Sequence, residues 1–210
     1  MLSRFEKEFG KRFFELRKHK GIDEAEAKKA VLDPLVFAAM LVRENHADGT
    51  VAGAINTTAA TVRAALQIIR KAPDADMVSS FFLMVLDKPH HKKKGTFVFA
   101  DAGLTIDPDA NQLASIAMAS ADSYARLVGN NPRIAMLSFS TVGSARHERV
   151  TQVVEATQMV QDRRPDLTIS GELQFDAAFV PEVAAAKAPD AAIQGDANVL
   201  VFPSLEAANI

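Results

Sequence analysis

The sequence contains no cysteine, which excludes disulfide bonds, thiolate metal sites and a cysteine nucleophile. It also lacks any run near the roughly 20 apolar residues that a membrane-spanning helix needs. The first 17 residues alternate charged residues with Phe and have no apolar signal-peptide core. Its 24 basic and 26 acidic residues nearly cancel, so there is no overall field for nucleic acid or an anionic membrane. We therefore expect a soluble, cytoplasmic protein with no nucleic-acid or membrane partner.

The composition is that of a globular protein, with 48% hydrophobic and 24% charged residues in 210. Apolar residues at helical spacing predict a first helix that ends at Gly21, a second capped by Asp23 and a third that starts at Pro34. The segment Gly49–Ile55 is short, apolar and glycine-containing, which is typical of a buried strand. A further helix is predicted to start at Asn56–Thr58.

The later part of the chain alternates apolar strands with helices. Met77–Leu86 and Gly95–Ala100 are expected to pair as a hairpin across a polar loop. Three more strands are predicted at Arg133–Ser140, Leu167–Leu173 and Asn198–Phe202, with helices that start at Pro108 and span Ser144–Asp162.

This alternation favours an α/β fold with mostly parallel sheets covered by helices. Near Ser79 a mainly helical pattern gives way to alternating strands and helices. This change predicts a partial first α/β domain over residues 1–78 and a second α/β domain over residues 79–210. The last predicted strand is followed by only eight residues, without a covering helix. We therefore expect the second domain to lack its C-terminal part.

Candidate ligand sites lie where predicted strands run into helices. Asn56, Thr57 and Thr58 place an amide and two hydroxyls at a helix start, and Arg63 follows about a turn and a half later. Exposed N–H groups, hydroxyls and a guanidinium suit an oxyanion. The alternative is an ordinary helix cap with a surface arginine, and the spacing does not choose between them.

Other polar clusters allow two interpretations each. The loop containing Ser138, Ser140, Thr141 and Ser144 suits an anion or nucleotide site, or a strand–helix connection with a serine cap; no Walker lysine or dinucleotide glycine motif accompanies it. The basic cluster around Arg17 is either a solvated helix end or a phosphate site.

Acidic residues and histidines leave further questions open. His90–Lys94 is most simply a solvated hairpin loop, with a phosphate or metal contact as the alternative, and the five histidines show no zinc-ligand spacing. Asp101, Glu172 and Asp176 lie at strand ends and either orient groups in a cleft or cap helices. We therefore expect no metal site.

Seven runs, in collinear order over nearly the whole chain, resemble the phosphate acetyl/butyryl transferase family, most closely its phosphotransacetylase branch. They are FELRKHKG (Phe14–Gly21), GAINTTAATVRAALQII (Gly53–Ile69), VSSFFLMVL (Val78–Leu86), FVFADAGL (Phe97–Leu104), AMLSFSTVGSARHE (Ala135–Glu148), GELQFDAAFVPEVAAAKAP (Gly171–Pro189) and ANVLVFPSLEAANI (Ala197–Ile210).

The resemblance implies two α/β domains with a cleft between them and the transfer of an acetyl group between coenzyme A and phosphate. It implies no metal, no covalent intermediate and no permanently bound cofactor, with coenzyme A as a substrate. The implied partners are acetyl-CoA or CoA, phosphate or acetyl phosphate, and a second copy in a homodimer. The family's substrate-contacting arginines fall on Arg17 and Arg63, and its hydroxyl-rich turn falls on Asn56, Thr57 and Thr58.

The sequence also departs from the family pattern. Asn56 stands at the usual His, Ala60 at an Asp, Ala64 at a Pro and Val142 at a Lys. The family's Asp-Leu-Ser-Arg-Gly motif would lie beyond Ile210, so no catalytic residue is assigned. We therefore expect a chain truncated at both ends that is an inactive fragment of a phosphate acetyltransferase. The alternatives are phosphate butyryltransferase or a non-catalytic acetyl-CoA-sensing module like the C-terminal part of large malic enzymes.

Overall fold

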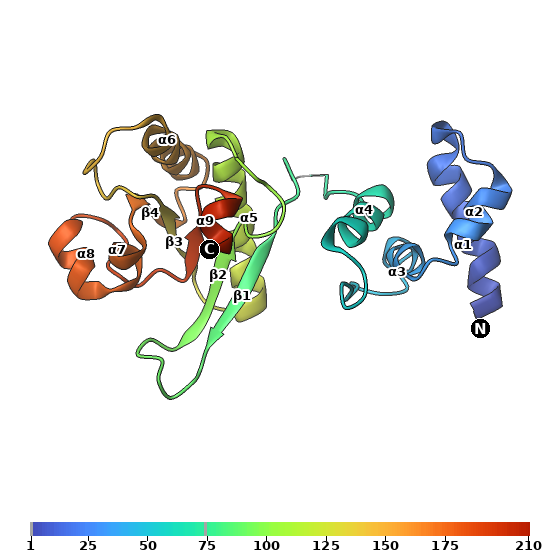
Figure 1. The fold of residues 1–210 in the computed structure, drawn as a ribbon, viewed down its shortest axis with the longest axis horizontal. Helices are drawn as coiled ribbons and strands as arrows, with labels where there is room; N and C mark the ends of the chain where they lie inside the picture. Colours follow the sequence, from blue (N-terminus) through green and yellow to red (C-terminus); the bar gives the residue numbers. More distant parts are fainter. Residues whose placement is uncertain (1, 74) are drawn as a thin grey trace. The chain divides into compact units, whose positions relative to one another are not determined.

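A computed structural model describes residues 2–73 and 75–210 of the chain. These residues belong to two compact units, Met1–Asp74 (unit 1) and Ala75–Ile210 (unit 2), coloured blue to cyan and green to red in Figure 1. Each unit has its own hydrophobic core.

Unit 1 is built from helices, and its predicted helix boundaries are confirmed. Gly21 takes a left-handed conformation (φ 84°) after the first helix, as a C-terminal glycine should. Asp23 and Glu26 form a reciprocal capping box, and Asp33 caps the next helix. The elements are α1 (Leu2–Arg17), the 3-10 helix η1 (Lys18–Lys20), α2 (Glu24–Ala30), α3 (Pro34–Arg43) and α4 (Thr58–Ile68).

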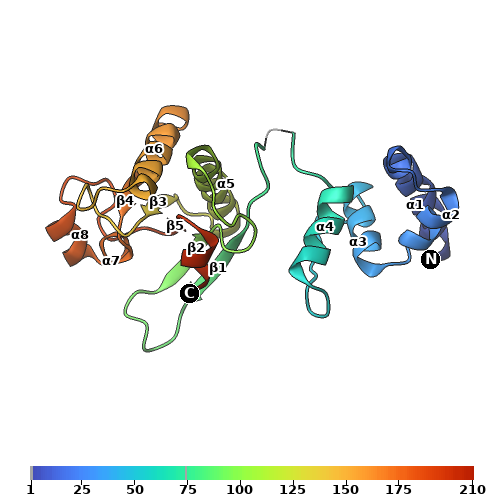
Figure 2. The same ribbon diagram turned by 45° about the horizontal axis from the view of Figure 1, so that its top comes forward.

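The core of unit 1 joins all four α-helices. Phe9 of α1, Met40 of α3 and Ile68 of α4 are completely buried in one cluster, which Val31 closes at the end of α2. Both Figure 1 and Figure 2 show α3 between α4 and the α1–α2 pair. Helix α3 therefore links α4 to the α1–α2 pair.

The predicted buried strand at Gly49–Ile55 is wrong. This segment forms no strand, and the side chains of Val51 and Ile55 are 106% and 95% exposed. Residues 2–73 contain no other strand with which it could pair, and an extended segment needs such a partner to satisfy its backbone groups. The described part of unit 1 is consequently helical and not α/β.

Unit 2 contains a five-stranded sheet in the order β1-β2-β5-β3-β4. β1 and β2 form the predicted antiparallel hairpin, with Phe82 opposite Phe99, and the remaining pairs are parallel. Both the hairpin and the mostly parallel sheet are thus confirmed. The strands are β1 (Phe81–Leu86), β2 (Gly95–Ala100), β3 (Arg133–Leu137), β4 (Thr168–Leu173) and β5 (Val199–Val201).

Helices cover both faces of this sheet, as predicted. Along β3, Ile134 and Met136 pack against the long helices, whereas Ala135 and Leu137 face the opposite cluster. The first cluster involves α5 (Ala110–Val128) and α6 (Glu148–Arg163); the second involves α7 (Phe175–Phe179) and α8 (Pro181–Lys187), and α9 (Leu205–Asn209) follows β5. Period-two alternation along one strand therefore supplies two cores. Among the described helices, none combines the length and apolarity that crossing a membrane requires.

Candidate functional site

The hydroxyl-rich turn of unit 1 caps α4. Thr57 Oγ1 accepts the backbone N–H of Ala60 at 3.2 Å, and the Thr57 carbonyl accepts the hydroxyl of Thr61 at 3.2 Å. Thr58 is exposed as the first helical residue, and Asn56 is half-buried just before the cap. The Thr57 hydroxyl is therefore occupied by capping, and the Thr58 hydroxyl remains accessible.

The two predicted anion-binding arginines lie on different helices of unit 1. Arg63 lies in the second turn of α4 and is exposed; Arg17 is half-buried at the end of α1, where Lys18 pairs with Glu15. Within residues 2–73 and 75–210, neither guanidinium has a hydrogen-bond or ion-pair partner. Both therefore keep their full set of N–H donors for an anion.

In unit 2, the loop after β3 turns two of its hydroxyls inward. Ser140 is fully buried; its hydroxyl donates to Glu172 Oε1 at 2.8 Å and accepts the N–H of Ala145 at 3.0 Å. The hydroxyl of Thr141, also buried, accepts the N–H of Gln174 at 2.9 Å. These two hydroxyls hold the loop in shape.

Ser138 and Ser144 are the more accessible hydroxyl residues of this loop. Ser138 is half-buried and its Oγ accepts the N–H of Ser140 at 3.3 Å. Ser144 is exposed, and its Oγ accepts the N–H of Thr141 at 3.0 Å and lies 3.2 Å from the Ser140 hydroxyl. The structure therefore brings Ser138, Ser140, Thr141 and Ser144 into one network.

Glu172 is the residue of this network that the sequence did not assign. It is buried in β4, and its Oε1 accepts the Ser140 hydroxyl and the Gly143 N–H at 2.7 Å. An acid next to the last residue of a predicted strand was the available signal, because a carboxylate buried there requires donors. Glu172 thus fixes the loop from the neighbouring strand.

The helix predicted from Ser144 begins later, at Glu148. Val142 (φ 47°) and Gly143 (φ 77°) form a left-handed turn directly before Ser144, and residues 144–147 are not helical. Ser144 bonds within the loop, and His147 caps α6 by accepting the N–H of Arg149 at its Nδ1, 3.1 Å away. The longer loop leaves the side chains of Phe139 and Val142 exposed.

The two other acids considered from the sequence have local structural partners. Asp101 is buried at the end of β2 and accepts bonds from the turn that follows, among them the N–H groups of Gly103 and Thr105. Asp176 pairs with Lys187 at 2.8 Å, and the hydrogen bond from Lys187 lowers the pKa of Asp176. Over residues 2–73 and 75–210, no three His, Asp or Glu side chains gather as a metal ion would require.

Together these features define the class of the protein. Unit 2 is an open α/β sheet with a polar loop at the carboxyl ends of β3 and β4, which is where such sheets bind ligands. Unit 1 adds two arginines with free donors, Arg17 and Arg63. The class is therefore an α/β protein with a polar loop at the carboxyl ends of its parallel strands.

Comparison with known proteins gives the family. The family model described as phosphate acetyl/butaryl transferase matches residues 2–210. A phosphate acetyltransferase of Acetivibrio thermocellus is 48% identical over 203 residues, covering 97% of this chain and 61% of the relative. The chain belongs to the phosphate acetyl/butyryl transferase family, and it spans about three fifths of the length of several of the curated relatives it matches.

Solved structures agree with this assignment. A phosphotransacetylase from Streptococcus pyogenes is similar with a TM-score of 0.84 and 46% identity, over 96% of this chain and 60% of that one. A branched-chain phosphotransacylase from Enterococcus faecalis is more distant, with a TM-score of 0.65 and 27% identity over 89% of this chain and 62% of that one. The α/β fold is therefore that of this family.

Proposed function

We propose that the protein transfers an acetyl group between coenzyme A and phosphate. The observation that carries this proposal is the exposed, unpartnered Arg63 behind the capped turn Asn56–Thr58 in a chain of this family. The curated relative from A. thermocellus carries the name phosphate acetyltransferase at 48% identity, whereas the branched-chain phosphotransacylase is 27% identical. This difference favours acetyl over longer acyl groups.

The reaction requires charge neutralisation and close positioning. A phosphate oxygen attacks the thioester carbonyl carbon, a C–O bond forms, the C–S bond breaks, and the leaving thiolate takes up a proton. Phosphate carries about two negative charges near neutral pH. Arginine forks can hold two of its oxygens through parallel charge-assisted hydrogen bonds, which also orient the third oxygen for attack. In this proposal, Arg63 and Arg17 supply those forks.

The remaining site residues divide into two roles. Thr58, Asn56, Ser138 and Ser144 remain accessible and are proposed to contact substrate. Thr57, Ser140 and Thr141 have hydroxyls that already bond within the protein, so they are proposed to shape the turn and the loop. Coenzyme A is a substrate in this scheme, and no permanently bound cofactor has a role.

A hybrid enzyme tests the function. Residues 1–210 replace the matching part of the A. thermocellus relative, and release of CoA thiol from acetyl-CoA is followed with and without phosphate. We expect phosphate-dependent release, with butyryl-CoA at least about tenfold poorer because each methylene shifts binding by about 1–3 kcal/mol. A hybrid that binds acetyl-CoA without releasing thiol would support the sensing module instead, and a preference for butyryl-CoA would support phosphate butyryl transfer.

We also propose that two copies associate through β1. This strand forms the edge of the described sheet, and the side chains of Leu83 and Val85 are 46% and 58% exposed on it. An apolar edge strand is a natural pairing surface between copies. Sedimentation should give a dimer for the chain and a monomer for Val85→Lys, whereas Leu127→Lys, an exposed position of α5, should leave the dimer intact. A monomeric parent chain would contradict this.

A further inference from the structure

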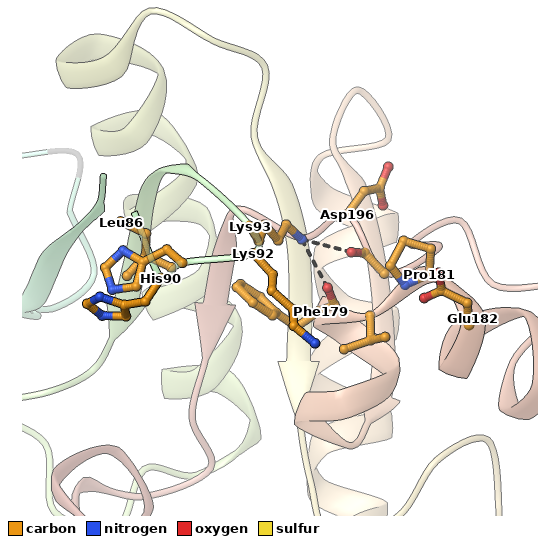
Figure 3. A pocket seen from close by; sticks show the side chains of 11 residues that line it. Leu86, His90, Lys92, Lys93, Phe179, Pro181, Glu182 and Asp196 are labelled. Atoms are coloured by element: carbon orange, nitrogen blue, oxygen red, sulfur yellow. Dashed lines mark hydrogen bonds between the residues drawn. The ribbon is translucent and has the colours of Figure 1, made fainter. Parts of the chain in front are cut away.

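Unit 2 contains a cavity of about 770 Å³ beside the hairpin loop between β1 and β2. Figure 3 shows His90 of that loop near Leu86, Lys92 and Lys93 of the same loop next to Phe179, and Pro181 and Asp196 beyond them. The volume lies within the usual range for small-molecule pockets.

The cavity lies at the opposite end of the strands from the loop around Ser140. Gly95, which begins β2, follows the hairpin loop directly, and Asp196 lies shortly before β5. Because β2, β5, β3 and β4 run parallel, these residues mark the amino ends of the strands. The loop around Ser140 follows the carboxyl end of β3. The cavity is therefore distinct from that loop and its network.

Lys93 holds the two walls of the cavity together. Its ammonium group donates to the carbonyl of Gly195 at 2.8 Å and to that of Phe179 at 3.2 Å, and it lies 4.2 Å from the centre of the Phe179 ring. Burial lowers the pKa of Lys93, and Asp196 opposes that shift. The lysine is thus committed to the protein itself, and the walls are in place before any ligand binds.

The wall of the cavity is largely apolar. Leu86 contributes from the end of β1, and Phe179, Val180 and Pro181 contribute from the junction between α7 and α8. The Phe179 ring packs on Phe97 with 5.4 Å between ring centres, so its position is set by the core. A flat or apolar group can therefore be buried here without rearrangement.

The hairpin-loop side of the rim carries the ammonium group of Lys92 and the imidazole of His90. Within the described residues, Lys92 and His90 have no hydrogen-bond or ion-pair partner, and both are exposed. Asp196 on the opposite side is already neutralised by Arg133, 2.6 Å away. Glu182 is then the acid at the rim that has no ion-pair partner among the described residues. An anionic group is best accommodated beside Lys92 and His90, away from Glu182.

We propose that this cavity binds a small organic anion with an apolar, aromatic body. Its anionic group lies beside Lys92 and His90, and its body contacts Phe179 and Pro181. The site is independent of the proposed acetyl transfer. Inorganic phosphate alone would leave the apolar wall uncovered, and a neutral aromatic molecule would leave the cationic rim unpaired.

The five histidines of the full chain make binding directly observable. Naphthalene-1-sulfonate serves as the probe, and the imidazole signals are followed by NMR during a titration. His90 and His91 line the cavity, whereas His19 and His46 lie in unit 1 and His147 caps α6. We expect saturable shifts at His90 and His91 only. Shifts confined to the other three, or none up to about 10 mM, would overturn the proposal.

Neighbouring lysines and a neutral probe give matched controls. Lys92→Glu should weaken binding at least about tenfold, because a charge-assisted contact is replaced by repulsion. Lys94→Glu, two residues along the same loop and outside the cavity, should change it less than about twofold. Naphthalene-1-sulfonamide should bind at least about tenfold more weakly than the sulfonate. Equal effects of the two variants, or equal binding of both probes, would contradict an anion site.

Discussion

Replacing Asp101 with alanine is expected to lower the free energy of unfolding of unit 2 by about 3 kcal/mol at pH 7. Its buried carboxylate accepts the N–H groups of Gly103, Leu104 and Thr105 at 3.0–3.1 Å, together with the hydroxyls of Thr105 at 2.9 Å and of Ser80. Alanine leaves all these donors without their acceptor. Since unfolding of unit 2 exposes Tyr124, the single tyrosine in a chain without tryptophan, tyrosine fluorescence during urea unfolding reports this unit.

The stability lost on removing the Asp101 carboxylate should become smaller as the pH falls. Burial raises the pKa of Asp101, but the hydrogen bonds led by Ser80 outweigh it, so the folded pKa lies below the ordinary value. A lowered folded pKa stabilises the protein above the unfolded pKa of about 3.9, and this contribution disappears as pH falls through the folded pKa. The difference between the parent chain and Asp101→Asn should therefore shrink from pH 7 to about pH 3.

An exposed aspartate nearby provides the control. Asp107 pairs with Arg149 across 3.5 Å at the surface, so Asp107→Asn should change stability by less than about 0.5 kcal/mol. Equal losses for Asp101→Asn at both pH values, or equal losses for the two variants at pH 7, would contradict the proposed role of the buried carboxylate.

Replacing Arg63 with alanine should lower phosphate-dependent turnover of the hybrid enzyme at least about tenfold, or roughly 1.4 kcal/mol. Arg63→Lys should recover only part of this loss, because lysine offers a point charge in place of a planar fork. The melting temperature should remain unchanged, since Arg63 is exposed and has no partner within the described residues. We therefore attribute the expected loss of turnover to a lost phosphate contact and not to a less stable fold.

Arg126 gives the matched comparison for this substitution. It is an exposed arginine in the last turn of α5, remote from the hydroxyl-rich turn in sequence, so Arg126→Ala should leave turnover unchanged. If Arg63→Ala also left turnover unchanged, the turn at Asn56–Thr58 would be an ordinary helix cap with a surface arginine.

Local chemistry explains which parts of the fold could be predicted from the sequence. Asp23 and Asp33 mark helix starts because a side chain can cap a backbone N–H only a few residues away. The hairpin of β1 and β2 was predictable because its strands are adjacent in sequence. Strand–helix alternation likewise predicted a parallel sheet covered on both faces. These signals need no knowledge of distant contacts.

Features that depend on distant partners were not predictable in the same way. The apolar pattern of Gly49–Ile55 indicates a strand, but a strand forms only where another strand can pair with it. Glu172 holds the loop by accepting the hydroxyl of Ser140, which lies 32 residues away in the sequence. The same hydrogen bond turns the Ser140 hydroxyl inward. The delayed start of α6 follows from the same network. Sequence spacing could place these polar groups at strand ends without showing which would be buried.

The most direct test of the central claim is to identify the product that the hybrid enzyme makes from acetyl-CoA and phosphate. Phosphorus NMR distinguishes acetyl phosphate from inorganic phosphate, and the released thiol is measured in the same sample. The account predicts one acetyl phosphate for each CoA released, with both products reduced together in Arg63→Ala. Thiol release accompanied by free acetate, without acetyl phosphate, would show hydrolysis and contradict transfer to phosphate.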